Sequence, residues 1–223
     1  MIALEIHGLE KRFVSHLHGG AELIVLRGVE LELERGSCTV LRGPSGSGKS
    51  SVLRCAYRTY RADAGRILVR AGGEDVDMAS ASDREVLRAR SRIGLATQFL
   101  HVVPRVGAAD LVAEQGMSLD EAREALDALG LPVALHDSAP ATFSGGERQI
   151  VNLAIALARP RPILLLDEVT ASLDPERRRR ALRMIAERKQ AGATLLAVFH
   201  DVPDTPGLVD RVLEMRGGRL VAT

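Results

Sequence analysis

Two patterns of apolar residues divide the chain. In about the first forty residues, short apolar runs at 4–6, 23–26 and 29–33 are separated by glycines at 8, 19–20 and 36. Short runs between glycine turns are typical of antiparallel strands. Later runs, at 38–41, 93–96, 163–166 and 195–199, show no polar alternation, which indicates strands buried on both faces. The pattern predicts an α/β fold with an N-terminal antiparallel β layer and a mainly parallel core sheet.

The segments between these core strands carry the marks of helix ends. Ser118 to Glu121 and Ser82 to Glu85 have the spacing of capping boxes, in which a serine and a glutamate satisfy each other's backbone N–H groups. The helix after Ser118 is predicted to stop at Gly130. We expect a single domain, in which 1–98 and 162–223 form the core and about 99–161 form an inserted helical subdomain.

A glycine-rich turn follows the first core strand and precedes a helical stretch. Glycines let the backbone bend tightly and direct several N–H groups at one anion, and the helix N-terminus adds its positive dipole end. Lysine at the end of such a turn reaches the outer phosphates of a nucleotide, and the next serine can ligate Mg²⁺. The predicted phosphate-binding residues are Gly43, Pro44, Ser45, Gly46, Ser47, Gly48, Lys49, Ser50 and Ser51.

The run 163–166 ends in two acids, Asp167 and Glu168. Successive side chains of a strand point in opposite directions, so Asp167 can face Mg²⁺ while Glu168 faces a water aligned on the γ-phosphate. We therefore expect Asp167 to bind the metal together with Ser50, and Glu168 to act as the catalytic base.

A second glycine-rich helix start lies at Ser144, Gly145, Gly146 and Glu147. One nucleotide does not need two such anion sites from one chain. This segment is therefore predicted to grip the γ-phosphate of a nucleotide held by another subunit.

Composition narrows the class of partner. Lys and Arg number 30 against 29 Asp and Glu, and aromatic residues make up 3% of the chain. A balanced charge and few stacking side chains argue against nucleic acid. Because the first twelve residues form no apolar leader and no apolar run is long enough to cross a bilayer, we expect a cytoplasmic protein without direct membrane insertion. Cys38 and Cys55 are expected to be small buried residues in a reducing compartment.

Two further clusters, one of arginines and one of histidines, are not expected to form binding sites. The run 177–180 consists of four arginines on a helix with an apolar opposite side, so we expect a solvated face rather than a phosphate or nucleic-acid patch. His16 and His18 stand two residues apart without a Cys or an acid cluster to complete a site, so no metal is expected there.

Because of the segment from Ser144 to Glu147, the chain resembles the ATP-binding cassette (ABC) ATPases. The resemblance implies a P-loop fold and a head-to-tail homodimer or heterodimer that holds two ATP molecules with Mg²⁺. It also implies that Gln98 contacts Mg²⁺ and the attacking water, that His200 senses the γ-phosphate, and that the loop 172–174, ending at Asp174, communicates across the dimer. Asp174 would equally serve as a helix cap. Phe13 stands where the family stacks an aromatic ring on adenine, and a core role is its alternative.

Three runs narrow the resemblance to the L subunit of the bacterial carbon-phosphorus lyase system: 98–106, 142–152 and 170–174. The similarity extends over essentially the whole chain. It implies work with the other carbon-phosphorus lyase subunits in the step that joins a phosphonate to the ribose of ATP and displaces adenine, giving a ribose 1-phosphonate 5-triphosphate.

Other functions stay open beside this one. The same residues suit the ATPase of an ABC transporter, whose groove between Gln98 and the second glycine-rich segment would receive a helix of a membrane subunit. A third candidate is an assembly module that binds ATP to dimerise and turns it over slowly. The chain departs from the family at Val169, where proline is typical, and at Ile150 and Ile155, where arginine is common. These departures predict a slow ATPase.

Overall fold

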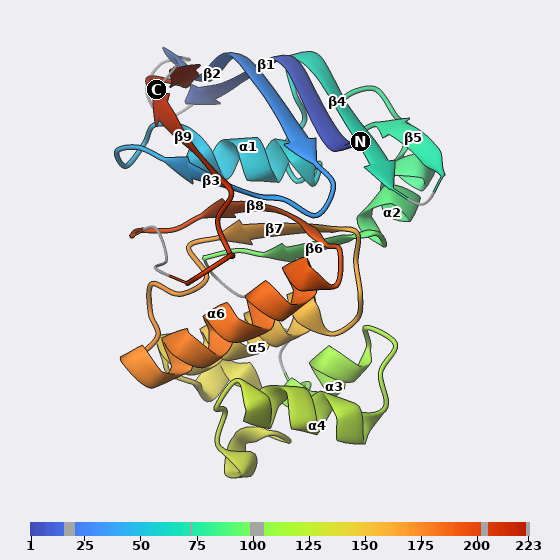
Figure 1. The fold of residues 1–223 in the computed structure, drawn as a ribbon, viewed down its shortest axis with the longest axis vertical. Coiled ribbons are helices and arrows are strands. Elements are labelled where there is room, and N and C mark those ends of the chain that lie inside the picture. The colour runs from blue at the N-terminus through green and yellow to red at the C-terminus, as the bar shows by residue number, and fades with distance from the viewer. Residues whose placement is uncertain (16–20, 72, 99–104, 202–204, 222–223) are drawn as a thin grey trace.

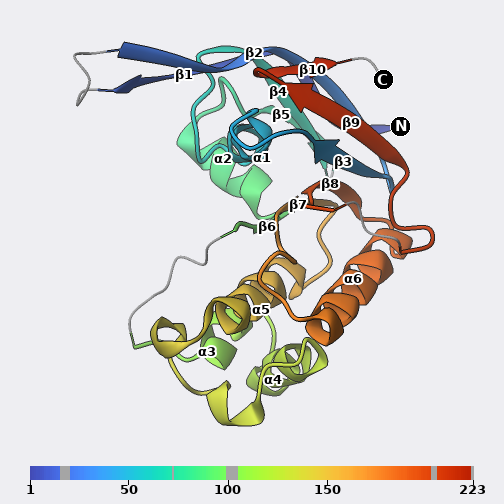
Figure 2. The ribbon, with the colours of Figure 1, turned by 90° about the vertical axis from the view of Figure 1, so that its left-hand side faces the viewer.

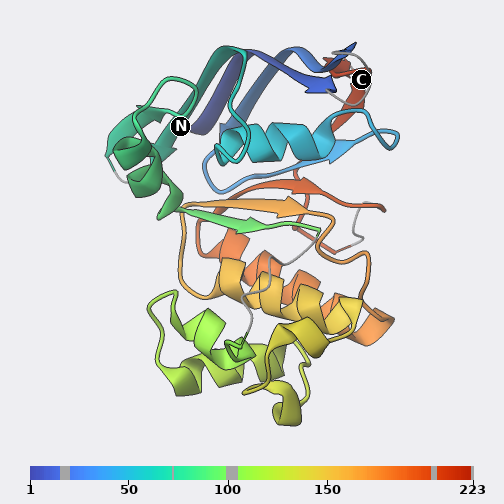
Figure 3. The ribbon, with the colours of Figure 1, turned by 180° about the vertical axis from the view of Figure 1, so that it is seen from behind.

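The computed structural model describes residues 1–15, 21–71, 73–98, 105–201 and 205–221. Figures 1 and 3 show its elements stacked in layers: an antiparallel sheet, the helix α1 (Lys49–Ala56), a second and mainly parallel sheet, then helices. The α/β fold expected from the apolar pattern is confirmed.

The antiparallel sheet has the strand order β2-β1-β4-β5. It is built from β1 (Ile2–Ser15), β2 (Ala21–Glu34), β4 (Ala64–Ala71) and β5 (Glu74–Asp77). The expectation of a turn at Gly8 was wrong, because β1 continues through it. The pairing with β2 shifts register between Ile6 and Leu9, so this glycine, with a φ of 58°, forms a bulge inside a long strand.

The second sheet has the order β10-β9-β3-β8-β7-β6. Four of its strands are those that the continuous apolar runs predict: β3 (Cys38–Arg42), β6 (Ile93–Ala96), β7 (Ile163–Asp167) and β8 (Thr194–Val198). They are parallel, and so is β9 (Arg211–Arg216) beside β3. The short strand β10 (Arg219–Val221) returns antiparallel to β9. Because all five parallel strands run the same way, the carboxyl ends of β3 and β7 meet at one edge.

Two hydrophobic clusters cover the two faces of this sheet. One fills the space between the sheets around α1 and includes Leu41, Leu53 and Leu165. The other lies under α5 (Gly145–Leu157) and α6 (Pro175–Gln190). Both cysteines are fully buried and unbridged, and burial raises the pKa of each thiol to about 12. They are therefore packing residues, as expected.

The segment between β6 and β7 is helical in its described part. It holds α3 (Ala108–Ala113), α4 (Leu119–Ala128), the 3-10 turns at Val133–Leu135 and Pro140–Thr142, and α5. Figure 2 shows α3 and α4 on the far side of α5 from the sheet. Their buried residues join those of α5 and β7 in one cluster, so the inserted segment packs continuously on the core. The capping box at Ser118 and Glu121 is present.

The remaining helix, α2 (Asp83–Arg90), follows the β4–β5 hairpin and leads into β6. Its capping box at Ser82 and Glu85 is present as predicted. Val86 is buried, whereas Leu87 is 64% exposed.

Candidate functional site: a nucleotide-binding face

The phosphate loop lies between the carboxyl end of β3 and the start of α1, as its sequence predicts. Gly43, Gly46 and Gly48 have φ values of 145°, 75° and 104°, which only glycine adopts readily. A Cβ on Gly43 would lie 2.1 Å from the backbone oxygen of Met215. The loop is therefore pressed against β9, and alanine cannot replace this glycine without moving the strand.

The start of α1 keeps its backbone donors free of side-chain caps. Gly48 is the N-cap, no side chain bonds to the first turn, and that turn holds no acidic residue. Lys49 turns back along the loop, and its Nζ donates to the carbonyl oxygens of Gly43 (2.8 Å) and Pro44 (2.9 Å). These features leave a positive helix end and a lysine around the space that the loop encloses.

The loop also holds a buried polar atom without a partner. Ser47 is 4% exposed, and its Oγ has no hydrogen bond among the described residues. Buried hydroxyl groups are normally paired. An unpaired hydroxyl in a loop of inward-facing donors suits a polyphosphate, so the residues present fit a nucleotide.

Ser50 and Asp167, 117 positions apart, meet directly. The Ser50 hydroxyl donates to Asp167 Oδ1 at 2.8 Å. Asp167 is 2% exposed; burial raises its pKa, opposed by the hydrogen bond from Ser50. A hydroxyl and a buried carboxylate at a phosphate loop are the oxygen ligands that Mg²⁺ takes beside nucleotide phosphates. Two of the three predicted metal ligands are thus brought together, and Mg²⁺ would supply positive charge against the outer phosphates.

Glu168 holds an unusual backbone conformation. Its φ is 52°, a left-handed value that is costly for a residue with a side chain, by about 1–3 kcal/mol. Its N–H donates to the carbonyl oxygen of Val198 at 2.9 Å, which anchors the turn to β8. The half-buried Glu168 lines the same cavity as Lys49. The sharp turn therefore directs a carboxylate to the phosphate loop.

That cavity has a volume of about 460 Å³ and lies where β3, β7, β8 and β9 end or pass the phosphate loop. His200 lines it, with 81% of its side chain exposed, and its Nδ1 lies 3.3 Å from Asp201 Oδ2. The structure therefore brings Lys49, Glu168 and His200 around one space. The full lining consists of Arg42, Gly43, Pro44, Ser45, Lys49, Glu168, Phe199, His200 and Glu214.

Three of those lining residues, Arg42, Phe199 and Glu214, were not among the predicted site residues. Glu214 comes from β9, a strand that the apolar pattern did not single out. Arg42 is the last residue of β3 and directly precedes the loop. A charged residue at the end of an otherwise buried strand was the available signal for Arg42, and the same signal did identify Asp167.

Gln98 is exposed and follows the edge strand β6. The carbonyl oxygen of its neighbour Thr97 accepts hydrogen bonds from the side chains of Gln149 and Asn152 on α5. The segment is thus tied to the helix that carries the second glycine-rich start. A metal or water contact of Gln98 stays a prediction.

The second glycine-rich start caps its own helix. Ser144 Oγ accepts from the Glu147 N–H at 3.3 Å, and Glu147 Oε2 accepts from the Ser144 N–H at 2.8 Å. Hydrogen bonds from the backbone N–H and the side chain of Ser144 to its carboxylate lower the pKa of Glu147. Gly145 has open space where a Cβ would stand, whereas a Cβ on Gly146 would lie 2.8 Å from the Ser172 carbonyl oxygen. Gly146 is therefore needed for packing against Ser172, whereas Gly145 leaves open space beside the helix start.

Asp174 is the N-cap of α6. Its side chain accepts from the N–H groups of Glu176 (3.0 Å) and Arg177 (2.9 Å). The role of helix cap that the sequence predicts for Asp174 is therefore confirmed. Communication across a dimer stays a prediction for this loop.

Phe13 lies in the β1–β2 hairpin and packs edge-on against Tyr60, with ring centroids 5.1 Å apart. Lys11 Nζ lies 5.1 Å from the centre of the same ring. Phe13 is not among the residues that line the phosphate cavity. Stacking on adenine stays a prediction for a ring that already has one aromatic neighbour.

The three departures from the family pattern are apolar packing positions. Val169 is fully buried and Ile150 is 1% exposed. Ile155 is half-buried against the same cluster. Val169 therefore fixes the turn after Glu168 by packing, where the family typically has proline.

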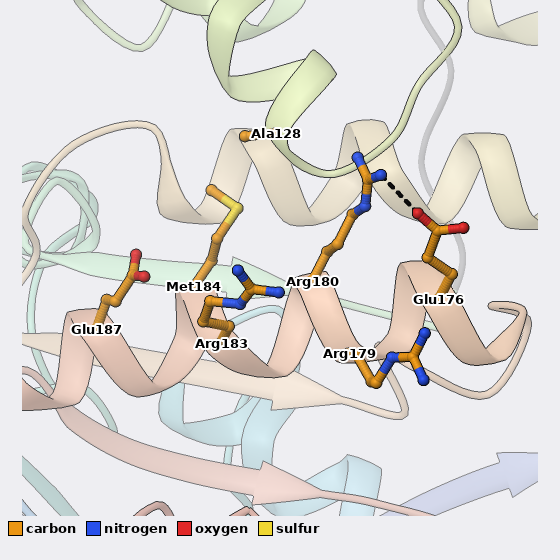
Figure 4. Close-up of a pocket in the computed structure, with 7 residues that line it drawn as sticks. All are labelled: Ala128, Glu176, Arg179, Arg180, Arg183, Met184 and Glu187. Atoms are coloured by element: carbon orange, nitrogen blue, oxygen red, sulfur yellow. Dashed lines mark hydrogen bonds and ion pairs between the residues drawn. The ribbon is translucent and has the colours of Figure 1, made fainter.

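A larger cavity, of about 590 Å³, lies between the end of α4 and α6. Figure 4 shows Arg180 and Met184 pointing from α6 toward Ala128, with Glu176 paired to Arg180. The expectation of a plainly solvated arginine face was incomplete, because two of these side chains also donate to backbone carbonyl oxygens. Arg177 Nε donates to Gly130 in the turn after α4, and Arg180 Nη1 donates to Asp127 near the end of α4. This groove has no glycine turn and no serine–carboxylate pair, so it is not the nucleotide site.

Within the described ranges, no cluster of three or more His, Cys, Asp or Glu side chains could hold a metal. The histidines at 16 and 18 lie outside those ranges, as do residues 99–104 of the run 98–106. No helix in the part that the structure describes has the length and apolar content needed to cross a bilayer.

The relatives found by sequence comparison are all named as ATP-binding proteins. A family model described as "ABC transporter" matches residues 26–171. The phosphonates import ATP-binding protein PhnC of Chromohalobacter salexigens is 35% identical, over 88% of this chain and 76% of its own. The lipoprotein-releasing system ATP-binding protein LolD of Ruegeria sp. is 36% identical over 99% and 98%. The methionine import ATP-binding protein MetN of Rhizobium johnstonii is 34% identical over 88% of this chain, which spans 55% of that relative.

Solved structures agree on the fold. A dimeric ATP-binding cassette in a post-hydrolysis state with ADP and Pi superposes with a TM-score of 0.85 at 23% identity, covering 97% of this chain and 96% of its own. A bacterial Atm1-family ABC exporter with ATP bound superposes with a TM-score of 0.78 at 26% identity, covering 99% of this chain and 38% of its own.

Proposed function

The chain belongs to the ABC transporter family of ATP-binding proteins, and on that premise we propose that it is a subunit that binds Mg-ATP, closes on a second cassette and hydrolyses the nucleotide to drive a partner assembly. The observation that carries this proposal is the convergence of Lys49, the Ser50–Asp167 pair and Glu168 at one phosphate loop. Together they supply a phosphate cradle, a metal position and a base.

The dimer follows from a second anion-binding helix start on the same chain. Ser144 and Gly145 are not among the residues that line the phosphate cavity, yet they form a helix N-terminus with open space beside Gly145. A head-to-tail partner would place its own copy of this segment over the γ-phosphate. That arrangement gives both helix starts an anion to bind.

Hydrolysis is tested by Glu168→Gln. The amide keeps the size and the hydrogen-bonding capacity of the side chain and removes its basicity, so ATP still binds while water activation fails. We expect turnover to fall at least about a hundredfold, within the range of general-base catalysis, and ATP-bound dimers to accumulate in sedimentation with Mg-ATP. Wild-type turnover in a folded variant would remove Glu168 from the role of base.

The relatives favour a membrane transporter as the partner assembly, since they are named for phosphonate import, methionine import and lipoprotein release. A groove of about 310 Å³ runs beside the edge strand β6. Apolar Leu95 and Ile155 lie in it, the exposed Leu87 adds to them, and three arginines stand around it. A helix of a membrane subunit with apolar and acidic side chains would suit this groove. The arginines are Arg90, Arg159 and Arg161.

A second candidate is the carbon-phosphorus lyase pathway, supported by the runs at 98–106, 142–152 and 170–174. In that case the groove beside β6 receives another lyase subunit. The chain then supports the formation of ribose 1-phosphonate 5-triphosphate from ATP and a phosphonate inside the cell.

Conversion of an added alkylphosphonate in cell lysates separates the two candidates, because lysis bypasses uptake. Lysates with and without the chain would be compared, with the purified chain added back as a control. Equal conversion in both lysates supports the transporter. Loss of conversion that the added chain restores supports the lyase pathway, and the Glu168→Gln protein should then fail to restore it if hydrolysis is required.

A further inference from the structure

An arginine whose side chain has no partner among the described residues lines the phosphate cavity. Arg42 ends β3, is exposed, and lines the cavity together with Lys49 and His200. Among the residues that the structure describes, its side chain forms no hydrogen bond, ion pair or ring contact, while its backbone pairs with β9. A free guanidinium beside a phosphate-binding loop is positioned for an anion, since its planar fork suits two phosphate oxygens at once.

The nearest acid in the ladder is held by another residue. Arg42 is the register partner of Glu214 on β9, and such neighbours commonly form a cross-strand ion pair. Here Arg216, two positions further along β9 and on the same face, donates through Nε (2.8 Å) and Nη2 (2.7 Å) to Glu214 Oε1. The Glu214–Arg216 pair thus leaves the charge of Arg42 available to the cavity.

The position of Arg42 in the cavity indicates which part of a nucleotide it meets. In a phosphate loop of this kind the backbone N–H groups hold the inner phosphates and the lysine reaches the outer ones. Arg42 lines the same cavity as Lys49 and Glu168. The predicted base and the γ-phosphate sensor occupy that same space. An anion beside Arg42 would therefore be the outermost phosphate rather than the inner two.

We propose that Arg42 binds the terminal phosphate of the nucleotide and gives this cassette a preference for triphosphate over diphosphate. The proposal rests on nucleotide binding at this cavity and adds a specificity residue to it. The Glu214–Arg216 pair acts as a positioning element, because it keeps Glu214 from neutralising Arg42.

The test is calorimetric titration of Mg-ATP and Mg-ADP into the full chain and three variants. In Arg42→Ala, affinity for ATP should fall about tenfold, which is the size of one exposed charge-assisted contact. Affinity for ADP should stay within about twofold. Arg42→Lys should recover part of the loss, since it keeps the charge without the fork. The matched control is Arg219→Ala, an exposed arginine of β10 outside the cavity lining, which should change neither affinity.

A double-mutant cycle tests the positioning element. Arg216→Ala frees Glu214 to pair with Arg42, so ATP affinity should fall about threefold in the otherwise unchanged protein, by the measure of one cross-strand ion pair. In the Arg42→Ala background it should have no further effect. Equal losses for ATP and ADP in Arg42→Ala, or no loss at all, would overturn the assignment. If the unaltered chain bound no ATP, the nucleotide site itself would fail, which is a separate result.

Discussion

Helices α1 and α5 both begin at a glycine-rich segment, yet they differ in whether a side chain caps their first backbone N–H groups. The start of α1 has a glycine N-cap and no side-chain cap. The start of α5 is closed by the capping box of Ser144 and Glu147. An uncapped helix start needs an external acceptor, whereas a capped one is already satisfied. The phosphate loop can therefore bind an anion by itself, and the α5 start can only assist a phosphate that is already held.

The charged residues in the first turn of each helix add to this difference in capping. Lys49 stands in the first turn of α1, and that turn holds no acid. The first turn of α5 carries Glu147, whose pKa is lowered by hydrogen bonds from Ser144. A carboxylate at this position opposes a second anion. The comparison predicts that α1 is the primary phosphate site and α5 a weaker, partner-dependent one.

The largest expected effect is at the primary site. Lys49→Ala removes the positive charge opposite the outer phosphates while leaving the fold intact, because the side chain faces the loop. ATP affinity should fall about a hundredfold, or ~2.7 kcal/mol, as expected for losing charge-assisted contacts. Calorimetry with Mg-ATP measures the loss, and an unchanged melting temperature serves as the control. Unchanged affinity would make the two helix starts equivalent and break the comparison.

The next effect separates the two glycines of α5. Gly145→Ala meets nothing within 4 Å in the monomer, and alanine favours helix by about 1 kcal/mol, so the monomer should keep or gain stability. A methyl group in the open space would obstruct a partner's nucleotide. ATPase activity should therefore fall about tenfold, a loss of ~1.4 kcal/mol in transition-state stabilisation, with unchanged binding of ATP to the monomer.

Gly146→Ala is the contrasting variant for that experiment. Its Cβ would lie 2.8 Å from the Ser172 carbonyl oxygen, so the monomer itself should melt at a lower temperature. If Gly145→Ala left ATPase activity unchanged, the α5 start would have no nucleotide to meet.

A smaller effect is expected from the charge at the α5 start. Glu147→Gln keeps the capping box geometry and removes the carboxylate that opposes a bound phosphate. The ATP-bound dimer should become about threefold tighter in sedimentation, a gain of ~0.7 kcal/mol that lies within the range for one charge at a helix N-terminus. Glu121→Gln is the matched control, because it makes the same change in the capping box of α4. Equal effects of the two variants would mean that the change acts through helix stability alone.

The smallest effect is in the pH dependence of the α5 start. The folded-state pKa of Glu147 lies below its ordinary value of 4.5, so the carboxylate stabilises the first turn fully above about that pH. The contribution is lost as the pH falls through the folded-state pKa. Amide hydrogen exchange of the first turn of α5 should accelerate over that window relative to the chemical rate. The first turn of α1, which holds no acid, should show no such acid-dependent loss.

Local sequence determined the phosphate loop, the core strands and the helix caps. Each depends on interactions within a few residues: glycine at positive φ, continuous apolar runs, and serine–glutamate spacing. These signals pointed to Lys49, Asp167 and Glu168, which the structure brings to the phosphate loop. The same reasoning missed β9 and read Gly8 as a turn, because strand pairing and bulges depend on distant partners.

Tertiary structure alone decided what the separate motifs do together. It brought Ser50 against Asp167 across 117 positions, set Gly146 under the Ser172 carbonyl oxygen, and turned part of the arginine run of α6 toward the end of α4. It also pairs Glu214 with Arg216, so the Arg42 side chain has no partner among the described residues. Sequence specifies which chemical groups exist and their local geometry, whereas the choice among competing partners depends on distances that only packing sets.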